Sequence, residues 1–251
     1  MFSFFSKSNY VIDLLPNSVD IHNHLLPGID DGAATVEDSM QMLYKLIDRG
    51  ITRFITTPHI LGDLYPNTPN TINNALQSVL QKLKEEGVDN IEIRAGAEYM
   101  MDEHFDTLIS DKGQTLQTLT STHILVEMSY MQPFLYLEDV LMKIKVRQLK
   151  PVLAHPERYA YYHSNPKYYS FLKDQGCALQ LNLLSLSPYY GKNVQRIAYT
   201  LLENNSIDFV GSDIHHLRHI NALKEIKIPS KLAKILTAKI NRTKDTFASY
   251  D

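Results

Sequence analysis

The sequence predicts an α/β fold in which a parallel sheet closes, or nearly closes, into a barrel. Seven short apolar runs alternate with amphipathic segments along the chain, and this alternation favours parallel strands joined by helices. The length of 251 residues suits one α/β barrel, which takes about 250 residues. The expected strands are residues 19–22, 54–57, 91–97, 124–128, 151–154, 178–181 and 209–211.

Amphipathic segments follow most of these strands and predict the outer helices. In the first, Thr35 is the expected N-cap, and Gly50 follows the last apolar turn as a stop signal. Apolar residues recur every three or four positions in each segment, as on a helix with one buried face. The expected helices are residues 36–49, 72–86, 137–147, 168–175 and 194–204, with a basic, docked helix at 229–251.

The chain shows no linker, repeat or low-complexity stretch, so residues 1–251 are predicted to form one domain. Residues 1–18 are an N-terminal extension and residues 229–251 a C-terminal helix in this interpretation. Phe2, Phe4 and Phe5 are expected to pack on the body or to fray, with peripheral membrane contact as the alternative.

Composition excludes several classes of protein. The net charge is −3 without a long basic run, which argues against nucleic-acid binding. No apolar stretch approaches the roughly 20 residues of a membrane span, so stable membrane insertion is not expected. The single cysteine, Cys177, excludes an intramolecular disulfide and suits a reducing cytoplasm.

Six of the seven expected strands end in histidine or carboxylate residues, where α/β barrels carry their functional groups. Each one alone would be a common structural or capping residue, but together they predict a metal site, because crowded carboxylates need cations to stay ionised. Nine ligands suit two or three ions, and imidazole with carboxylate favours Mn, Fe or Zn. The candidates are His22, His24, Asp31, His59, Glu98, Glu127, His155, Asp213 and His215.

The remaining histidines and the sixth strand are predicted to be structural. His104, His123 and His163 do not follow a strand, whereas His216 and His219 lie near the site in sequence and are candidates for support of the ligands. The sixth strand ends in Asn182 and contributes nothing ionisable.

These motifs resemble the PHP (polymerase and histidinol phosphatase) superfamily. The resemblance is carried by His22-Asn-His24, Thr57-Pro-His59, Gly96-Ala-Glu98, His155-Pro-Glu-Arg158 and Ser212-Asp-Ile-His215, together with Asp31 and Glu127. The runs from Asp20 to Gly32 and from Ala154 to Tyr159 resemble the bacterial manganese-dependent protein-tyrosine phosphatases of capsule and exopolysaccharide loci still more closely.

The resemblance implies a distorted (β/α)7 barrel with a trinuclear metal site. By motif position, one metal takes His22, His24, Glu98 and Asp213. A second takes Glu98, Glu127 and His155, and a third takes Asp31, His59 and His215. Arg158 and Arg218 match the arginines that the family places beside the phosphate.

The implied activity is hydrolysis of phosphotyrosine on proteins, with an autophosphorylated bacterial tyrosine kinase as the expected partner. A hydroxide bridging Mn²⁺ ions is the expected nucleophile, because metal binding lowers the pKa of water. A cysteine-dependent mechanism is excluded, since position 183, six residues after Cys177, is Leu183 rather than arginine. The alternatives are another PHP phosphoesterase, such as a histidinol-phosphate phosphatase, and a non-catalytic metal-containing binding protein.

Overall fold

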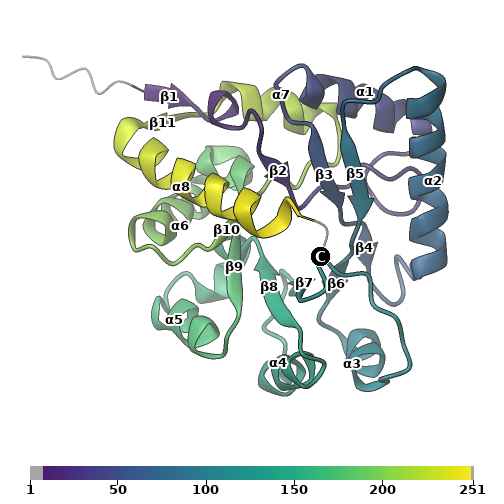
Figure 1. Cartoon of the computed structure of the whole chain (residues 1–251). Coiled ribbons are helices and arrows are strands. Elements are labelled where there is room, and N and C mark those ends of the chain that lie inside the picture. Colours follow the sequence, from purple (N-terminus) through teal and green to yellow (C-terminus); the bar gives the residue numbers. More distant parts are fainter. Residues whose placement is uncertain (1–7, 250–251) are drawn as a thin grey trace, which may run out of the picture.

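Parallel strands surround the centre of the molecule and helices cover them from outside, as in a barrel of the expected (β/α)7 type (Figure 1). The computed structural model describes residues 8–249, so Phe2, Phe4 and Phe5 lie outside the described residues. One sheet has the order β2-β3-β5 and the other the order β10-β9-β8-β7-β6-β4. Their strands are β2 (Val19–Asp20), β3 (Arg53–Thr56), β4 (His59–Ile60), β5 (Glu92–Ala95), β6 (Glu98–Met100), β7 (His123–Glu127), β8 (Lys150–Ala154), β9 (Ala178–Asn182) and β10 (Phe209–Gly211).

Two of the seven expected strands, those at 54–57 and 91–97, are each followed by a second short strand. β4 follows β3 after two residues, and β6 follows β5 after two residues. Hydrogen bonds bridge these intervals, from Gly96 N to Thr56 O at 2.8 Å and from Glu98 N to Pro58 O at 3.0 Å. Pro58, in the first interval, has no N–H to donate to a ladder. The expected strand at 91–97 corresponds to β5, and the sequence did not predict the separate segments β4 and β6.

The two sheets meet where the first and last strands end. An isolated parallel bridge pairs Asn23 with Ile214. On either side of it, Asp213 N donates to His22 O at 2.7 Å and His24 N donates to Ile214 O at 2.9 Å. These bonds hold the residues after β2 against the residues after β10, so the ends of the strands from both sheets face one centre.

All six predicted helices are present within a few residues of their expected bounds. Thr35 caps α1 as predicted, in a reciprocal capping box with Asp38. The sequence analysis missed α3 and α7, which are short and carry few apolar residues. The helices are α1 (Val36–Ile47), α2 (Pro69–Glu85), α3 (Glu103–Ser110), α4 (Leu137–Val146), α5 (Lys167–Asp174), α6 (Lys192–Glu203), α7 (Leu217–Glu225) and α8 (Ser230–Phe247). Short 3₁₀ turns lie at Ile12–Leu14, Pro156–Arg158, Ala160–Tyr162, Leu183–Leu186 and Pro188–Tyr190.

The first described residues, 8–18, pack into the body of the molecule. β1 (Ser8–Tyr10) pairs antiparallel with β11 (Lys227–Pro229), a pair that the sequence analysis did not predict. Val11, Ile12 and Leu15 are buried in the main apolar core. Residues 8–18 are therefore part of the packed structure.

A separate apolar cluster fills the inside of the barrel at the amino ends of its strands. It includes Val19, Ile55, Leu125 and Phe209 from the strands and Phe247 from α8. Figure 1 shows α8, in yellow, crossing this part of the molecule beside β2 and β10. Polar residues occupy the opposite, carboxyl ends of the strands. Among the described residues, no helix is long and apolar enough to cross a membrane.

Candidate metal centre

The nine predicted ligands lie together at the carboxyl ends of the strands. Four overlapping groups of them bring ligand atoms within 4.8 Å of one another. Strand register explains part of this, because His59 and Glu98 begin β4 and β6 as direct neighbours, and Glu127 pairs with Met100 at the end of β7. Parallel strands carry their ends to the same edge, so residues far apart in sequence meet there.

In the first of the three groups predicted from the motifs, the ligand atoms lie as far apart as the ligands of one metal ion do. His22 Nε2 lies 3.1 Å from Glu98 Oε2 and 3.3 Å from Asp213 Oδ1. His24 Nε2 lies 3.5 Å and 3.4 Å from the same two oxygens, and 3.4 Å from His22 Nε2. Ligands about 2.0–2.2 Å from an ion lie about 3.0–3.5 Å from each other. These four residues, grouped together by motif position, therefore fit one metal ion.

The second group centres on the carboxylates of Glu98 and Glu127. His155 Nε2 lies 3.1 Å from Glu98 Oε1 and 3.9 Å from Glu127 Oε2. His59 also reaches this group, with Nδ1 2.9 Å from Glu127 Oε1 and 3.2 Å from Glu98 Oε2. The predicted grouping assigned His59 to the third metal alone, whereas its ring lies between the second and third groups.

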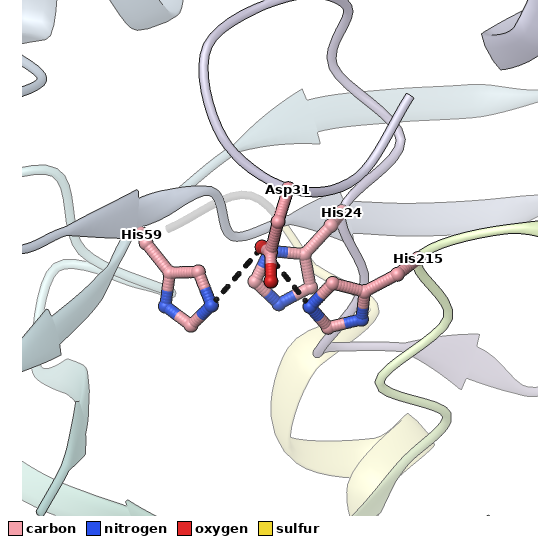
Figure 2. Close-up of side chains that lie close together, drawn as sticks. All are labelled: His24, Asp31, His59 and His215. Carbon is pink, nitrogen blue, oxygen red and sulfur yellow. Dashed lines mark ion pairs between the residues drawn. The ribbon is translucent and has the colours of Figure 1, made fainter. Parts of the chain in front are cut away.

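The third group surrounds Asp31 (Figure 2). The Asp31 carboxylate lies between two imidazoles, with Oδ1 3.5 Å from His59 Nε2 and 3.4 Å from His215 Nε2. The His24 ring stacks on the His215 ring with centroids 3.8 Å apart. This group is the most exposed of the three, because half of the Asp31 side chain is accessible to solvent.

Three of the histidines are held by a second group at the nitrogen that faces away from the centre. His22 Nδ1 lies 2.8 Å from Gln180 Oε1, and His24 Nδ1 lies 2.7 Å from Asp30 Oδ2. His215 Nδ1 lies 3.0 Å from the carbonyl oxygen of Asp213. An acceptor at Nδ1 keeps the proton there and leaves Nε2 free as a ligand, as is usual for histidines that bind metals.

Two predicted ligands have a backbone conformation that is uncommon for residues other than glycine. His155 has φ 36° and Asp213 has φ 51°. His155 directly follows β8 and Asp213 comes two residues after the end of β10, and the left-handed turn redirects a side chain that would otherwise follow the alternation of the strand. Such conformations are held only where the surrounding structure enforces them, and they concentrate at functional sites.

The charges of the centre compensate one another. Burial opposes ionisation of Asp31, but the hydrogen bond and charge of His215 and the charge of His59 outweigh burial and lower its pKa to about 2. Burial also opposes protonation of His59, but Glu98 and Glu127 outweigh it and raise its pKa to about 9. Burial raises the pKa of Glu98, yet the surrounding histidines hold it well below its usual range. Asp31 and Glu98 are thus kept ionised, which is the state that binds cations.

Two buried atoms at the centre make ion-pair contacts only, without a hydrogen bond of good geometry among the described residues. They are Glu98 Oε2 and His59 Nδ1, which lie 3.2 Å apart. Buried polar atoms are nearly always hydrogen-bonded, and each of these two atoms has an electron pair that it can donate to a metal ion. The donor set and these two atoms therefore fit bound metal.

The centre forms the floor of a pocket of about 510 Å³. On one wall of the pocket, Arg158 Nη1 donates a hydrogen bond to Asp213 Oδ2 at 2.9 Å. Its guanidinium lies over the rings of Tyr130 and Tyr190, 4.6 Å and 4.1 Å from their centroids. Tyr65 stacks on His59 with centroids 5.7 Å apart. The pocket thus combines a polar floor with aromatic walls and one arginine.

Arg218, the second predicted arginine, lies elsewhere. It is exposed at the start of α7 and lines a separate cavity of about 310 Å³, together with Met42. His215 and His216 line both cavities, so Arg218 is near the centre without facing it. Its predicted contact with phosphate remains a prediction.

Two other residues singled out in the sequence are structural. Tyr159, which follows Arg158 in the motif, is fully buried, and its hydroxyl bonds to Met128 N and Ala154 O. Cys177 is buried, and burial raises the pKa of its thiol to about 12. His219 Nδ1 accepts a hydrogen bond from His215 N at 3.2 Å, which agrees with its expected supporting role.

Sequence analysis missed the contribution of the sixth strand. Asn182, which ends β9, donates from Nδ2 to Asp213 Oδ2 at 2.8 Å. Gln180, two residues earlier on the same face, holds His22. Neither residue ionises, so neither was a candidate among the ionisable residues at the strand ends. The alternation of side chains along the strand, which puts both residues on the inner face, was the signal that could have identified them.

Comparison with known proteins agrees with this geometry. The sequence profile of the family described as "Capsular polysaccharide synthesis, CpsB/CapC" matches residues 18–231. The chain belongs to the CpsB/CapC family. The resemblance stated from the motifs is therefore confirmed.

Proteins with similar sequences are named as tyrosine-protein phosphatases. The chain is 30% identical over 203 residues to the tyrosine-protein phosphatase YwqE of Bacillus subtilis, covering 81% of this chain and 79% of YwqE. It is 29% identical over 206 residues to the tyrosine-protein phosphatase CpsB of Streptococcus pneumoniae, covering 79% and 83% of the two chains.

Solved structures show the same fold. A crystal structure from a study of YwqE and CpsB, described as metal-dependent tyrosine phosphatases, matches with a TM-score of 0.75, 28% identity and coverage of 93% and 96%. Histidinol phosphate phosphatase from Lactococcus lactis, solved with zinc, histidinol and phosphate, matches with a TM-score of 0.52 and 16% identity, covering 93% and 94%. The second likeness concerns the fold alone.

Proposed function

We propose that this protein is a metal-dependent protein-tyrosine phosphatase. The observation that carries the proposal is the set of His and carboxylate ligand atoms on the floor of a pocket with aromatic walls. The names of the CpsB/CapC relatives, which are tyrosine-protein phosphatases, support the same reaction.

The residues that would hold the metals are the nine predicted ligands, in the three groups described above. Two or three bound ions, Mn²⁺ in our proposal, would activate water as the nucleophile and neutralise charge on the phosphate. Fe and Zn suit the same donors. Binding would displace protons from the imidazoles, because only the neutral ring is a ligand.

The protein's own residues would bind and orient the substrate. The guanidinium of Arg158 carries N–H groups in a fixed fork that matches phosphate oxygens, and its position between Tyr130 and Tyr190 limits its movement. The tyrosines offer ring faces to an aromatic leaving group. A phenolate leaving group has a pKa near 10, so it needs less proton donation than an alkoxide. His59 or His215 would donate a proton to a poorer leaving group only if it were not fully committed to a metal.

We further propose the setting of this activity. The substrate would be a phosphotyrosine protein, specifically an autophosphorylated bacterial tyrosine kinase of capsule or exopolysaccharide synthesis. The lone cysteine suits a cytoplasmic location. Residues 1–251 would act as one domain, since the main core draws residues from Val11 through to Ile240.

The deciding experiment is a panel of three substrates with and without metal. The purified protein, treated with a chelator and then supplied with Mn²⁺, Fe²⁺ or Zn²⁺, is assayed on a phosphotyrosine peptide, on histidinol phosphate and on a DNA 3′-phosphate. We expect metal-dependent hydrolysis of the phosphotyrosine peptide at the highest kcat/KM. Faster hydrolysis of histidinol phosphate would identify another phosphoesterase, and no turnover on any substrate would identify a binding protein.

Two variants test the mechanism in the same assay. Arg158→Ala should raise KM and lower kcat on every phosphate ester, because the arginine would contact the phosphate rather than the leaving group. Cys177→Ser should keep wild-type activity, since the thiol is buried and protonated. Full activity after chelation, or loss of activity in Cys177→Ser with its fold intact, would contradict the metal mechanism.

A further inference from the structure

A second cavity, of about 480 Å³, adjoins the pocket above the metal centre. It is called the apolar groove here and is bounded by Leu61, Met100, the start of α3 and the segment 132–136 before α4. Leu61 and Met100 also line the pocket, so the two cavities share a wall. A ligand bound in the groove would therefore lie next to a ligand bound in the pocket.

The groove presents apolar side chains to solvent. Leu135 is 88% exposed and Tyr136 is 61% exposed. The rings of Phe134 and Tyr136 meet edge to face with centroids 6.0 Å apart. Leu64, on the rim of the neighbouring pocket, is also exposed. A contiguous apolar surface of this kind marks an interaction site more often than isolated exposed residues do.

The charges of the groove are acidic. Asp102 and Glu103 are the charged residues that line it. Asp102 is occupied as the N-cap of α3, where its Oδ1 accepts a hydrogen bond from Phe105 N at 2.7 Å. Glu103 is exposed and adds a negative charge to the lining of the groove. The groove thus favours apolar side chains and repels acidic ones.

We infer that the apolar groove binds the substrate polypeptide beside its phosphotyrosine and takes an apolar or aromatic side chain from it. This inference rests on the proposed function. An extended chain advances about 3.3 Å per residue with alternate side chains on one face, so a residue two positions away lies about 7 Å from the phosphotyrosine on the same side. The shared wall at Leu61 and Met100 gives that side chain a continuous path from the pocket into the groove.

The test compares phosphotyrosine peptides that differ at one position. Two sets carry Leu, Ser or Asp two residues before or two residues after the phosphotyrosine, and p-nitrophenyl phosphate is the small substrate without a peptide. For wild-type protein with Mn²⁺, we expect the Leu peptide of one set to exceed the Asp peptide by about tenfold in kcat/KM, as a single apolar contact gives.

Leu135→Asp should remove most of this preference and leave hydrolysis of p-nitrophenyl phosphate unchanged. The matched control is Met142→Asp, because Met142 is 59% exposed on α4 outside the groove. It should keep the preference. Both positions are at the surface, so both variants should fold, which thermal melting checks.

Two results would overturn the inference. One is an equal preference in the wild-type protein and Leu135→Asp. The other is a wild-type dimer in size-exclusion chromatography that Leu135→Asp dissociates while the peptide preference persists, which would assign the groove to a second copy of the chain. Failure of the proposed function gives a different result, namely no hydrolysis of p-nitrophenyl phosphate or of any phosphotyrosine peptide.

Discussion

The two ends of the barrel are built from the same strands but differ completely in chemistry. At the amino ends, Val19, Ile55 and Phe209 form an apolar cluster with Phe247 of α8. At the carboxyl ends, histidines and carboxylates face one another at about ion-pair distance. The change occurs within one or two residues, for example from Leu125 to Glu127 on β7. The apolar end therefore supplies stability, and the polar end carries the groups that would react. Substitutions at the two ends test this division.

The largest effect is expected at the centre, from Glu98→Gln. Glu98 lies between His22, His59 and His155, so loss of its charge weakens more than one metal position. We expect kcat/KM on an aryl phosphate to fall by roughly a thousandfold, since a bound metal contributes several kcal/mol to catalysis. Steady-state assays in saturating Mn²⁺, with metal content determined by mass spectrometry, measure this. If the variant kept wild-type activity and metal content, Glu98 would not be a metal ligand.

The next largest effect is expected at the opposite end, from Phe247→Ala. Its ring packs against Phe209 and His123 at centroid distances of 4.9 Å and 5.3 Å, and removing it leaves a cavity. We expect a loss of about 3–5 kcal/mol in the free energy of unfolding, measured in urea. kcat/KM of the folded variant should stay near the wild-type value, and Phe247→Leu should lose less stability. A large fall in kcat/KM at full stability would contradict the division between the two ends.

A smaller effect at the centre is expected from Asn182→Asp. Aspartate keeps the acceptor for Leu184 N, but it loses the N–H that holds Asp213 and adds a like charge beside it. We expect Mn²⁺ affinity to fall by about tenfold or somewhat more, as is usual when a group that orients a ligand is lost. Titration of the metal-free protein measures the affinity. Unchanged affinity would show that Asn182 serves only the turn that follows β9.

The smallest effect concerns pH at the apolar end. Burial, followed by the charge of Lys150, lowers the pKa of His123 from 6.5 to about 4. Neutral His123 therefore contributes stability above pH 6.5, and this contribution is lost as the pH falls from about 6.5 to 4. Because the ring is partly exposed and screened by solvent, we expect a difference of about 1 kcal/mol. Urea unfolding at pH 7 and pH 4.5 should show a smaller loss in His123→Gln than in the wild type; equal losses would contradict this origin.

Much of the fold follows from local pattern. The seven strand positions and six of the helices were predictable because each is a run with one clear period, and some also have a cap or glycine at an end. Two helices were not. α3 and α7 are eight and nine residues long, and the apolar residues that they bury are Phe105 and Ile109 in α3 and Ile220 and Leu223 in α7. The pairing of β1 with β11 joins residues more than 200 positions apart and has no local signal.

The candidate site divides in the same way. The nine candidate ligands could be chosen from their types and their positions after strands, and the structure brings them together. Their grouping was not, because the place of His59 between two groups depends on the orientation of its ring. Arg158 and Arg218 look equivalent in sequence, but one lies over two tyrosine rings in the pocket and the other faces a neighbouring cavity.

Residue type and strand period are local properties of the chain, so the available donor atoms and their positions after parallel strands could be predicted from the sequence. The folded structure was needed to show which donors lie together, which neutral side chains orient them and which apolar surface continues the pocket. These depend on backbone turns such as those at His155 and Asp213 and on packing between distant segments, where distances of a few ångströms decide whether two groups interact.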